Sequence, residues 1–195
     1  MTIACRMTAK GAALLIIDVQ DKLLVKMAKG PLVVANSVRL IQAAKLLGIP
    51  VMATEQYPKG LGATNKAVAD LIPNRPEKMA FHCCAVPAIL EHLFAHNITH
   101  VALAGIEAHI CVAQTALELM TQNFHVQIVA DAVASRHEFD AEIALRRLER
   151  CGAILTTTET ALFEWTETAD HPRFKEISAL VTKFEPPATL IPTPH

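Results

Sequence analysis

The sequence predicts an α/β fold in which helices cover both faces of a mostly parallel sheet. Apolar runs of strand length alternate along the chain with segments whose apolar residues recur at helical spacing. The first run, Ala12–Ile17, is continuously apolar, as expected of a strand buried on both faces. Alternating strands and helices require crossover connections, which produce a doubly wound parallel sheet.

The first half of the chain supplies two of the predicted strands. Ala12–Ile17 is followed by helical spacing over Leu32–Leu47, which a glycine ends. A second apolar run, Ile49–Thr54, gives way to turn residues. We then expect a short helix at Lys66–Ile72, a break at several prolines, and a helix at Val86–His96.

The second half continues the alternation. Residues 98–106 are predicted as a third strand and His109–Gln122 as the helix that follows it. Residues 124–131 form a fourth expected strand, followed by an amphipathic helix at Phe139–Arg150. Residues 153–158 are predicted as a further strand.

Two helices are expected towards the end of the chain, at Thr160–Trp165 and Phe174–Phe184. The chain contains no internal repeat and no linker, and 195 residues can bury an ample core. We therefore expect one domain over residues 1–185, followed by a Pro-rich tail over residues 186–195.

The composition restricts the class of protein. Hydrophobic residues make up 52% and charged residues 19%, which excludes disorder and is compatible with an oligomer that buries further surface. A net charge of −1 favours neither nucleic acid nor an acidic membrane as a partner. No apolar run approaches the roughly 20 residues of a transmembrane helix, and no secretory signal is evident, so we expect a cytoplasmic protein.

Five cysteines with irregular spacing do not form a disulfide framework, and a reducing compartment fits better. Adjacent Cys83 and Cys84, next to His82, lack the spacing of a zinc site. The chain also lacks GxGxxG, GxxxxGK[ST], GxSxG and HExxH motifs. We therefore expect neither a cofactor nor a metal.

Three positions stand at the ends of predicted strands: Asp18, Glu55 to Tyr57, and Gly105 to Glu107. In parallel sheets the ligand site lies beyond the carboxyl ends of the strands, so these positions should converge there. Cys111 lies where the third strand gives way to a helix, and we expect the positive helix end to lower its pKa and make it a nucleophile.

Each of these residues also has a structural interpretation. Asp18 could act as a base or cap the next turn. Lys78 could stabilise negative charge or be a surface lysine at the edge of a short strand. Cys111 could be a buried structural cysteine, as we interpret Cys83, Cys84 and Cys151 to be. His109 should point to another helix face than Cys111.

Five stretches, LLIIDVQ, TEQYPKGLG, EKMAFHCC, LAGIEAHICV and VADAVASR, resemble the isochorismatase-like cysteine hydrolase family. TEQYPKGLG and GIEAHIC resemble its subgroup of isochorismatase domain-containing proteins in particular. The resemblance covers roughly residues 10 to 185. It implies a three-layer α/β/α sandwich that forms homo-oligomers, either dimers or tetramers.

By this resemblance, Asp18, Lys78 and Cys111 would form a catalytic triad. A cis peptide between Ile106 and Glu107 would aim the N–H of Glu107, with that of Cys111, at an oxyanion hole. The implied reaction is metal-independent cleavage of a C–N bond, such as an amide or carbamoyl bond of a small molecule, through a thioester on Cys111. Histidines that bind metal in nicotinamidases have no counterpart at residues 55–58, which argues against nicotinamidase activity.

Six residues around these positions are candidates for the substrate pocket: Gln20, Tyr57, Leu61, Phe81, His82 and His109. Three other functions stay open. The protein could be a catalytically quiet oligomer with an interaction role, or a nicotinamidase-type amidase. It could also be a thiol-redox protein, although no CxxC motif supplies a resolving cysteine.

Overall fold

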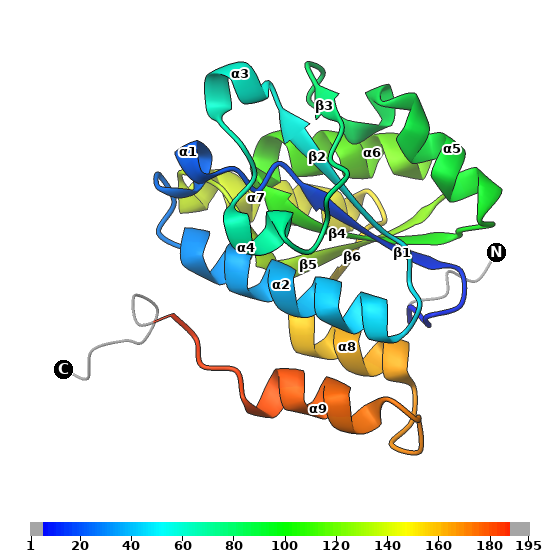
Figure 1. The fold of residues 1–195 in the computed structure, drawn as a ribbon. Helices are drawn as coiled ribbons and strands as arrows, with labels where there is room; N and C mark the ends of the chain where they lie inside the picture. The colour runs from blue at the N-terminus through cyan, green and yellow to red at the C-terminus, as the bar shows by residue number, and fades with distance from the viewer. Residues whose placement is uncertain (1–5, 188–195) are drawn as a thin grey trace.

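The computed structural model describes residues 6–187, which form a three-layer α/β/α sandwich (Figure 1). Its six strands pair in the order β3-β2-β1-β4-β5-β6, and every pairing is parallel. The strands are β1 (Ala12–Ile17), β2 (Val51–Gln56), β3 (Glu77–Lys78), β4 (His100–Ile106), β5 (His125–Ala134) and β6 (Ile154–Thr156).

Helices cover both faces of this sheet. The α-helices are α1 (Asp21–Leu24), α2 (Gly30–Leu46), α3 (Pro58–Leu61), α4 (Lys66–Ala69), α5 (Pro87–Ala95), α6 (Ala113–Thr121), α7 (Glu138–Arg150), α8 (Thr158–Thr166) and α9 (Phe174–Thr182). A 3₁₀ turn, η1 (Cys83–Ala85), precedes α5, and a π turn, η2 (Ala108–Val112), precedes α6. Helices α2, α8 and α9 lie on one side of the sheet and α5, α6 and α7 on the other (Figure 1).

Strand β1 explains why an unbroken apolar run is needed at the centre of the sheet. Ala12, Leu14 and Ile16 belong to the hydrophobic cluster under α2 and α8. The alternate residues of the strand pack into the cluster under α5 and α6. Each side chain of β1 is at most 1% exposed, because successive residues of a strand point to opposite faces and both faces are covered.

The strand order reverses direction at the centre of the sheet, and such folds bind ligands in a crevice at the carboxyl ends of the strands. The chain moves outward from β1 to β2 and β3, then crosses back to add β4, β5 and β6 on the other side. The carboxyl ends of β1 and β4 therefore lie at a topological switch point, where α/β sheets bind ligands. Asp18 follows β1, Lys78 ends β3, and Glu107 follows β4.

Gly105 allows β1 and β4 to approach closely beside this crevice. It pairs with Ile17, next to Asp18, and has φ of +118°. A Cβ atom at this position would lie 2.1 Å from the carbonyl oxygen of Ile17. The β4–β5 register also shifts between Leu103 and Gly105. A residue without a side chain is therefore required here for both conformation and space.

The predicted fold class is confirmed, and the main differences are in short elements. Strand β2 extends two residues beyond the predicted end, to Gln56, because residues 77–78 pair with its last two residues. Helices α1 and α3, of four residues each, were not predicted, because they are too short for helical periodicity to show. The predicted tail falls largely on residues 188–195, outside the described part. Within residues 6–187, no helix is long and apolar enough to cross a bilayer.

Replacing Gly105 with alanine should destabilise the fold by about 3 kcal/mol or more, because the new methyl group would overlap the backbone of Ile17. Gly152→Ala is the matched control, since Gly152 also has positive φ, at +105°, but no atom within 4 Å of the added Cβ. We expect the control to lose only about 1–2 kcal/mol. Urea unfolding of both variants measures the difference, and equal losses would contradict the proposed close approach.

Candidate active site

A buried ion pair and a thiol meet at the crevice. Asp18 follows β1, Lys78 is in β3, and Cys111 lies in the π turn η2, which follows β4. The Nζ atom of Lys78 lies 2.6 Å from Oδ2 of Asp18, and the two side chains are 1% and 0% exposed. Lys78 is therefore a buried part of the site, and its interpretation as a surface lysine is wrong.

The ammonium group of Lys78 is surrounded by acceptors. Besides Asp18, it donates to Oε1 of Gln56 at 2.6 Å and to the carbonyl oxygens of Phe81 at 2.9 Å and Ala80 at 3.3 Å. An ammonium group has three protons, so these four acceptors occupy its donor capacity. Lys78 is therefore suited to act through its charge.

The other carboxylate oxygen of Asp18 is bound from β2. The hydroxyl of Thr54 donates to Oδ1 of Asp18 at 2.8 Å. The same hydroxyl lies 3.4 Å from the Sγ atom of Cys83. Cys83 is fully buried, and its backbone N–H donates to the Thr115 hydroxyl at 2.9 Å. Both oxygens of Asp18 are thus held in place from neighbouring elements.

Cys111 presents its thiol to the same group of side chains. Its Sγ atom lies 3.9 Å from Oε1 of Gln56, within the range of a weak S–H hydrogen bond. The residue is 6% exposed, so only a narrow part of it reaches the surface. A π turn interrupts the regular helix at this residue, and such turns frequently occur at functional sites.

The buried environment changes how these groups bind protons. Burial raises the pKa of Asp18, although the charge and hydrogen bond of Lys78 and the hydrogen bond of Thr54 oppose this. Burial alone would lower the pKa of Lys78, but attraction by Asp18 and by the thiols of Cys83 and Cys111 outweighs it and raises the pKa. Lys78 therefore stays cationic, and Asp18 accepts a proton more readily than an exposed carboxylate.

The prediction that Cys111 has a lowered pKa is wrong. Burial and the negative charge of Asp18 raise its pKa to about 12, although Lys78 acts in the opposite direction. Burial likewise raises the pKa of Cys83 to about 11. The resting thiol is thus protonated.

The backbone between β4 and Cys111 has an unusual course. The peptide bond between Ile106 and Glu107 is cis. The carboxylate of Glu107 accepts hydrogen bonds from the N–H of Arg136 at 2.9 Å and from its Nε atom at 3.1 Å. Glu107 is 6% exposed, so this pairing fixes the segment to the loop after β5.

The six predicted pocket residues differ in their surroundings. Gln20 is completely buried, and its amide is bonded to the backbone of Gln56 and to the carbonyl of Gly62, so it braces the site instead of lining an open surface. Tyr57 and Phe81 are 46% and 50% exposed. Leu61, His82 and His109 are half-buried. The Nδ1 atom of His109 lies 2.8 Å from the hydroxyl of Ser135, which follows β5.

The sequence placed Gln56 at the strand ends only as part of Glu55 to Tyr57 and gave it no role, and it did not indicate Thr54 or Cys83 as site residues. Gln56 binds Lys78 and Cys111, Thr54 binds Asp18, and Cys83 lies against Thr54. The alternation within β2 offers a signal for two of them, because Thr54 and Gln56 are two residues apart and share a face. Cys83 and Cys84 are buried, as interpreted, but Cys151 is exposed, because it follows the last residue of α7.

The carboxylates and histidines near the site are not arranged for a metal. Within the described part of the chain, no group of three or more His, Cys, Asp or Glu side chains could hold a metal ion. Residues 55–58 are the segment where the family resemblance would place the metal ligands of a nicotinamidase. The carboxylate of Glu55 in this segment accepts hydrogen bonds from Thr64 and from Arg75. Glu55 therefore fixes the loop that follows β2.

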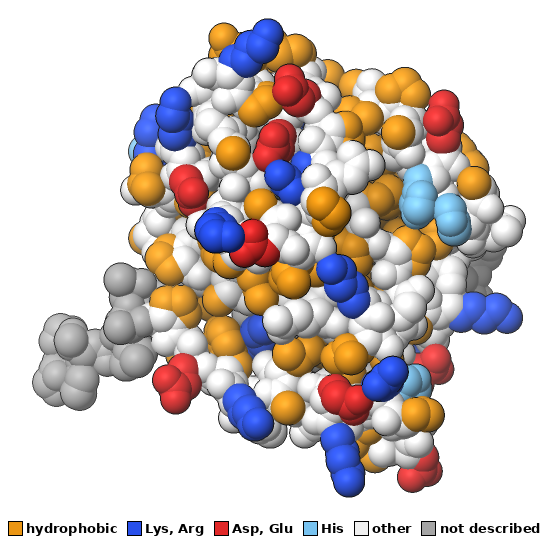
Figure 2. All heavy atoms as spheres, viewed as in Figure 1, with side chains coloured by type: hydrophobic (Ala, Val, Ile, Leu, Met, Phe, Trp, Pro, Cys, Tyr) orange, Lys and Arg blue, Asp and Glu red, His pale blue; other side chains and the backbone are white. Residues whose placement is uncertain are grey.

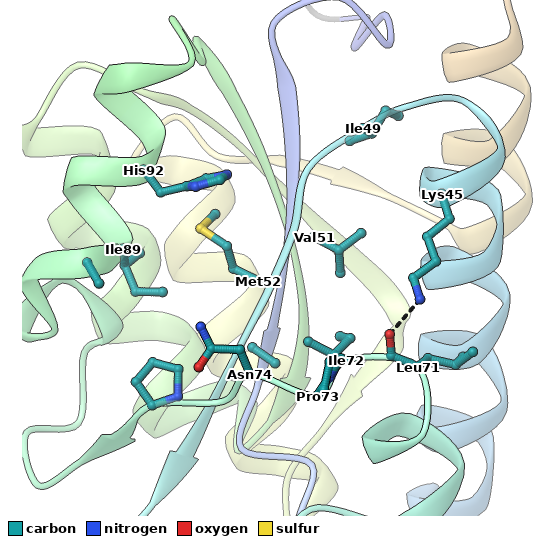
Figure 3. A pocket seen from close by; sticks show the side chains of 13 residues that line it. Lys45, Ile49, Val51, Met52, Leu71, Ile72, Pro73, Asn74, Ile89 and His92 are labelled. Atoms are coloured by element: carbon teal, nitrogen blue, oxygen red, sulfur yellow. Dashed lines mark hydrogen bonds between the residues drawn. The ribbon is translucent and has the colours of Figure 1, made fainter.

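A separate cavity of ≈ 490 Å³ lies at the other end of β2, shown in Figure 3. Val51 and Met52 line it, and they lie four or five residues before Gln56, or roughly 13–16 Å along the strand. Its lining is mostly apolar, and Lys45 is bonded to the carbonyl of Leu71. The cavity is therefore distinct from the crevice that holds Cys111.

The face of the described residues in Figure 2 has no large patch of a single charge. Acidic and basic side chains are interspersed there. This distribution agrees with the net charge of −1.

The sequence matches known proteins over most of its length. The model of the isochorismatase domain matches residues 12–160. The chain is 39% identical to isochorismatase domain-containing protein 2 of Danio rerio over 188 residues, which covers 95% of this chain and 94% of that protein. It is 36% identical to the Homo sapiens protein of the same name, covering 95% and 90% of the two chains.

Solved structures have the same architecture. A Caenorhabditis elegans protein described as MAR1 ribonuclease superposes with a TM-score of 0.87 at 38% identity, covering 97% of this chain and 99% of that one. The Escherichia coli YcaC gene product, described as an octameric hydrolase of unknown specificity, superposes with a TM-score of 0.80 over 94% and 98% of the two chains. Its identity is 21%, so this similarity shows the fold alone.

Replacing Lys78 with methionine should leave the Asp18 carboxylate buried without a counter-charge. We expect a loss of about 3–5 kcal/mol in the free energy of unfolding at neutral pH. Without Lys78 the pKa of Asp18, already raised by burial, rises further, so the loss should be small in acid and grow as the pH rises through this pKa.

Urea unfolding of Lys78→Met over a range of pH measures this effect. An Asp18→Asn, Lys78→Met double variant is the control, because it removes both charges and should recover most of the stability at high pH. A double variant as unstable as the single variant would show that lost packing, and not the unpaired charge, is responsible.

Proposed function

The chain belongs to the isochorismatase family, and from this membership we propose that it is a metal-independent cysteine hydrolase that cleaves a C–N bond of a small molecule. The bond would be an amide, carbamoyl or related group. Cys111 would be the nucleophile, Asp18 the base and Lys78 the cation that stabilises the charged forms. The observation that carries the proposal is the 2.6 Å ion pair between Asp18 and Lys78, buried beside the Cys111 thiol.

The first step would be a proton transfer within the site. The thiol is protonated at rest, because burial and Asp18 raise its pKa to about 12. Asp18 would take this proton, and its raised pKa favours that transfer. The negative charge would then move from the carboxylate to the sulfur while Lys78 remains cationic. The thiolate would therefore be a minor species until a substrate is present to react with it.

The thiolate would attack the carbonyl carbon of the substrate, forming a C–S bond and a tetrahedral oxyanion. The backbone N–H groups of Glu107 and Cys111 would hold this oxyanion. Asp18 would return its proton to the leaving nitrogen, the C–N bond would break, and a thioester would remain on Cys111. Water would then attack the thioester, with Asp18 as base, to release the acid and regenerate the thiol.

The burial of Cys111 favours a small substrate. Cys111 is only 6% exposed, so a large polymer could reach the sulfur only through an extended side group. Five of the predicted pocket residues would border the approach to the Cys111 sulfur: Tyr57, Leu61, Phe81, His82 and His109. Gln20 is buried behind them and would hold the end of β2 in position.

Two alternatives remain. The C. elegans relative is described as a ribonuclease, which would require a phosphodiester substrate. The net charge of −1 provides no long-range attraction for RNA. The chain could also be a catalytically quiet member of the family with an interaction role. A nicotinamidase-type amidase is disfavoured because Glu55 is engaged by Thr64 and Arg75.

An activity screen should detect acyl transfer to Cys111. Small amides and carbamoyl compounds, together with a fluorogenic RNA, would be incubated with the protein, and intact-protein mass spectrometry would search for an acyl adduct. Cys111→Ser should lose about 10³-fold or more of the turnover, because it removes the nucleophile. Cys151→Ser is the control and should retain full activity, since Cys151 is an exposed thiol outside the site.

Turnover that persists in Cys111→Ser would exclude the proposed nucleophile. RNA cleavage without amide hydrolysis would favour the activity named for the C. elegans relative. Absence of any adduct or turnover would favour the catalytically quiet alternative.

We also propose that the protein assembles into a homo-oligomer, either a dimer or a tetramer. Tyr57, Met79 and Phe81, which are 46%, 71% and 50% exposed, lie on the segments that follow β2 and β3 beside the crevice. Exposed apolar side chains close together are typical of protein interfaces. Sedimentation velocity should show a species larger than a monomer, and Met79→Lys should weaken it. A monomeric native protein would contradict this proposal.

A further inference from the structure

We propose that Gln56 is a positioning residue that holds the ammonium group of Lys78 between Asp18 and Cys111. This inference rests on the proposed role of Cys111 as the nucleophile. It assigns a function to a side chain that neither accepts the thiol proton of Cys111 nor attacks the substrate.

One oxygen atom of Gln56 joins two members of the triad. Its Oε1 atom accepts a hydrogen bond from Nζ of Lys78 at 2.6 Å, and the Sγ atom of Cys111 lies 3.9 Å from the same oxygen. The Nζ atom of Lys78 also lies 2.6 Å from Oδ2 of Asp18. The ammonium group therefore contacts both the Gln56 amide and the Asp18 carboxylate, and the same amide oxygen faces the Cys111 thiol.

The orientation of the amide is fixed at its other end. The Nε2 atom of Gln56 donates to the carbonyl oxygen of Met79 at 2.9 Å. Rotating the amide by half a turn would place its NH₂ group against the ammonium group of Lys78, with two donors facing each other. Only the observed orientation satisfies both ends of the side chain.

A second glutamine holds the backbone of the first. The Oε1 atom of Gln20 accepts from the N–H of Gln56 at 2.9 Å, and its Nε2 atom donates to the carbonyl of Gln56 at 3.0 Å. Gln20 is completely buried in the segment after β1. The segment that carries Asp18 is thereby tied to the strand end that carries Gln56.

A neutral amide suits this position better than a carboxylate. The charged or ionisable groups that act on the Cys111 thiol are Asp18, Lys78 and Cys83, on three different elements. Lys78 is the cation among them, and it must compensate Asp18 before the proton transfer and the thiolate after it. A second carboxylate beside Lys78 would compete for that charge, whereas the amide oxygen satisfies a proton of Lys78 without adding charge.

Alkylation of Cys111 by iodoacetamide tests this role without an identified substrate. The rate at Cys111 would be followed by peptide mass spectrometry at a fixed, mildly alkaline pH, where the rate is proportional to the thiolate fraction. Gln56→Met keeps the length of the side chain but loses the acceptor, so Lys78 should stabilise the thiolate less. We expect alkylation to slow by about tenfold, which corresponds to one unit of pKa.

Gln56→Glu is a second variant of nearly the same shape, and it should also slow alkylation because it adds negative charge beside the sulfur. Gln122→Met is the matched control: Gln122 is exposed at the end of α6, and its substitution should leave the rate unchanged. A merely structural role would have the opposite effect, because loosening the site would expose the thiol and speed its alkylation.

Unchanged or faster alkylation in Gln56→Met would overturn the positioning role and leave the proposed nucleophile intact. If Gln56→Met does not fold, unchanged or faster alkylation in Gln56→Glu would overturn the positioning role. In the native protein we expect Cys111 to be alkylated more slowly than exposed Cys151, because burial keeps its thiol protonated.

Discussion

The buried ion pair between Asp18 and Lys78 is the constraint on which the crevice depends. Two charges 2.6 Å apart, with side chains at most 1% exposed, have lost their hydration, and removing an ion from water costs several kcal/mol. Their mutual attraction compensates only when the remaining donors and acceptors are also satisfied. The hydroxyl of Thr54 and the amide of Gln56 meet this requirement, together with two backbone carbonyls.

The same ion pair determines the state of the thiol. An isolated cation beside Cys111 would favour a resting thiolate, but the cation here is already paired with a carboxylate. Burial and that carboxylate keep Cys111 protonated. In the proposed reaction, the charge that Lys78 compensates moves from oxygen to sulfur within one buried site. Reactivity would thus depend on a substrate carbonyl being in place, and the free thiol would be protected from unselective attack.

The fold supplies this site through the geometry of its central strands. Gly105 lets β4 approach the end of β1, and the π turn that follows brings Cys111 towards Asp18 and Lys78. The pairing of Gln20 with Gln56 ties the segment after β1 to the end of β2. Residues as distant as Asp18 and Lys78, 60 positions apart, are therefore held by short contacts at the carboxyl ends of the strands.

The sequence by itself predicted five of the six strands and a parallel sheet, because apolar runs such as Ala12–Ile17 are continuous and separated by helical segments. It gave neither the order of the strands nor the two-residue strand β3. It also indicated that Asp18 and the segment before Cys111 lie at strand ends. Only the tertiary structure decided that Lys78 is buried, that the thiol has a raised pKa, that Gln56 binds Lys78, and that Thr54 binds Asp18. Burial, charge compensation and hydrogen-bond partners depend on residues distant in the chain, and local periodicity carries no information about them.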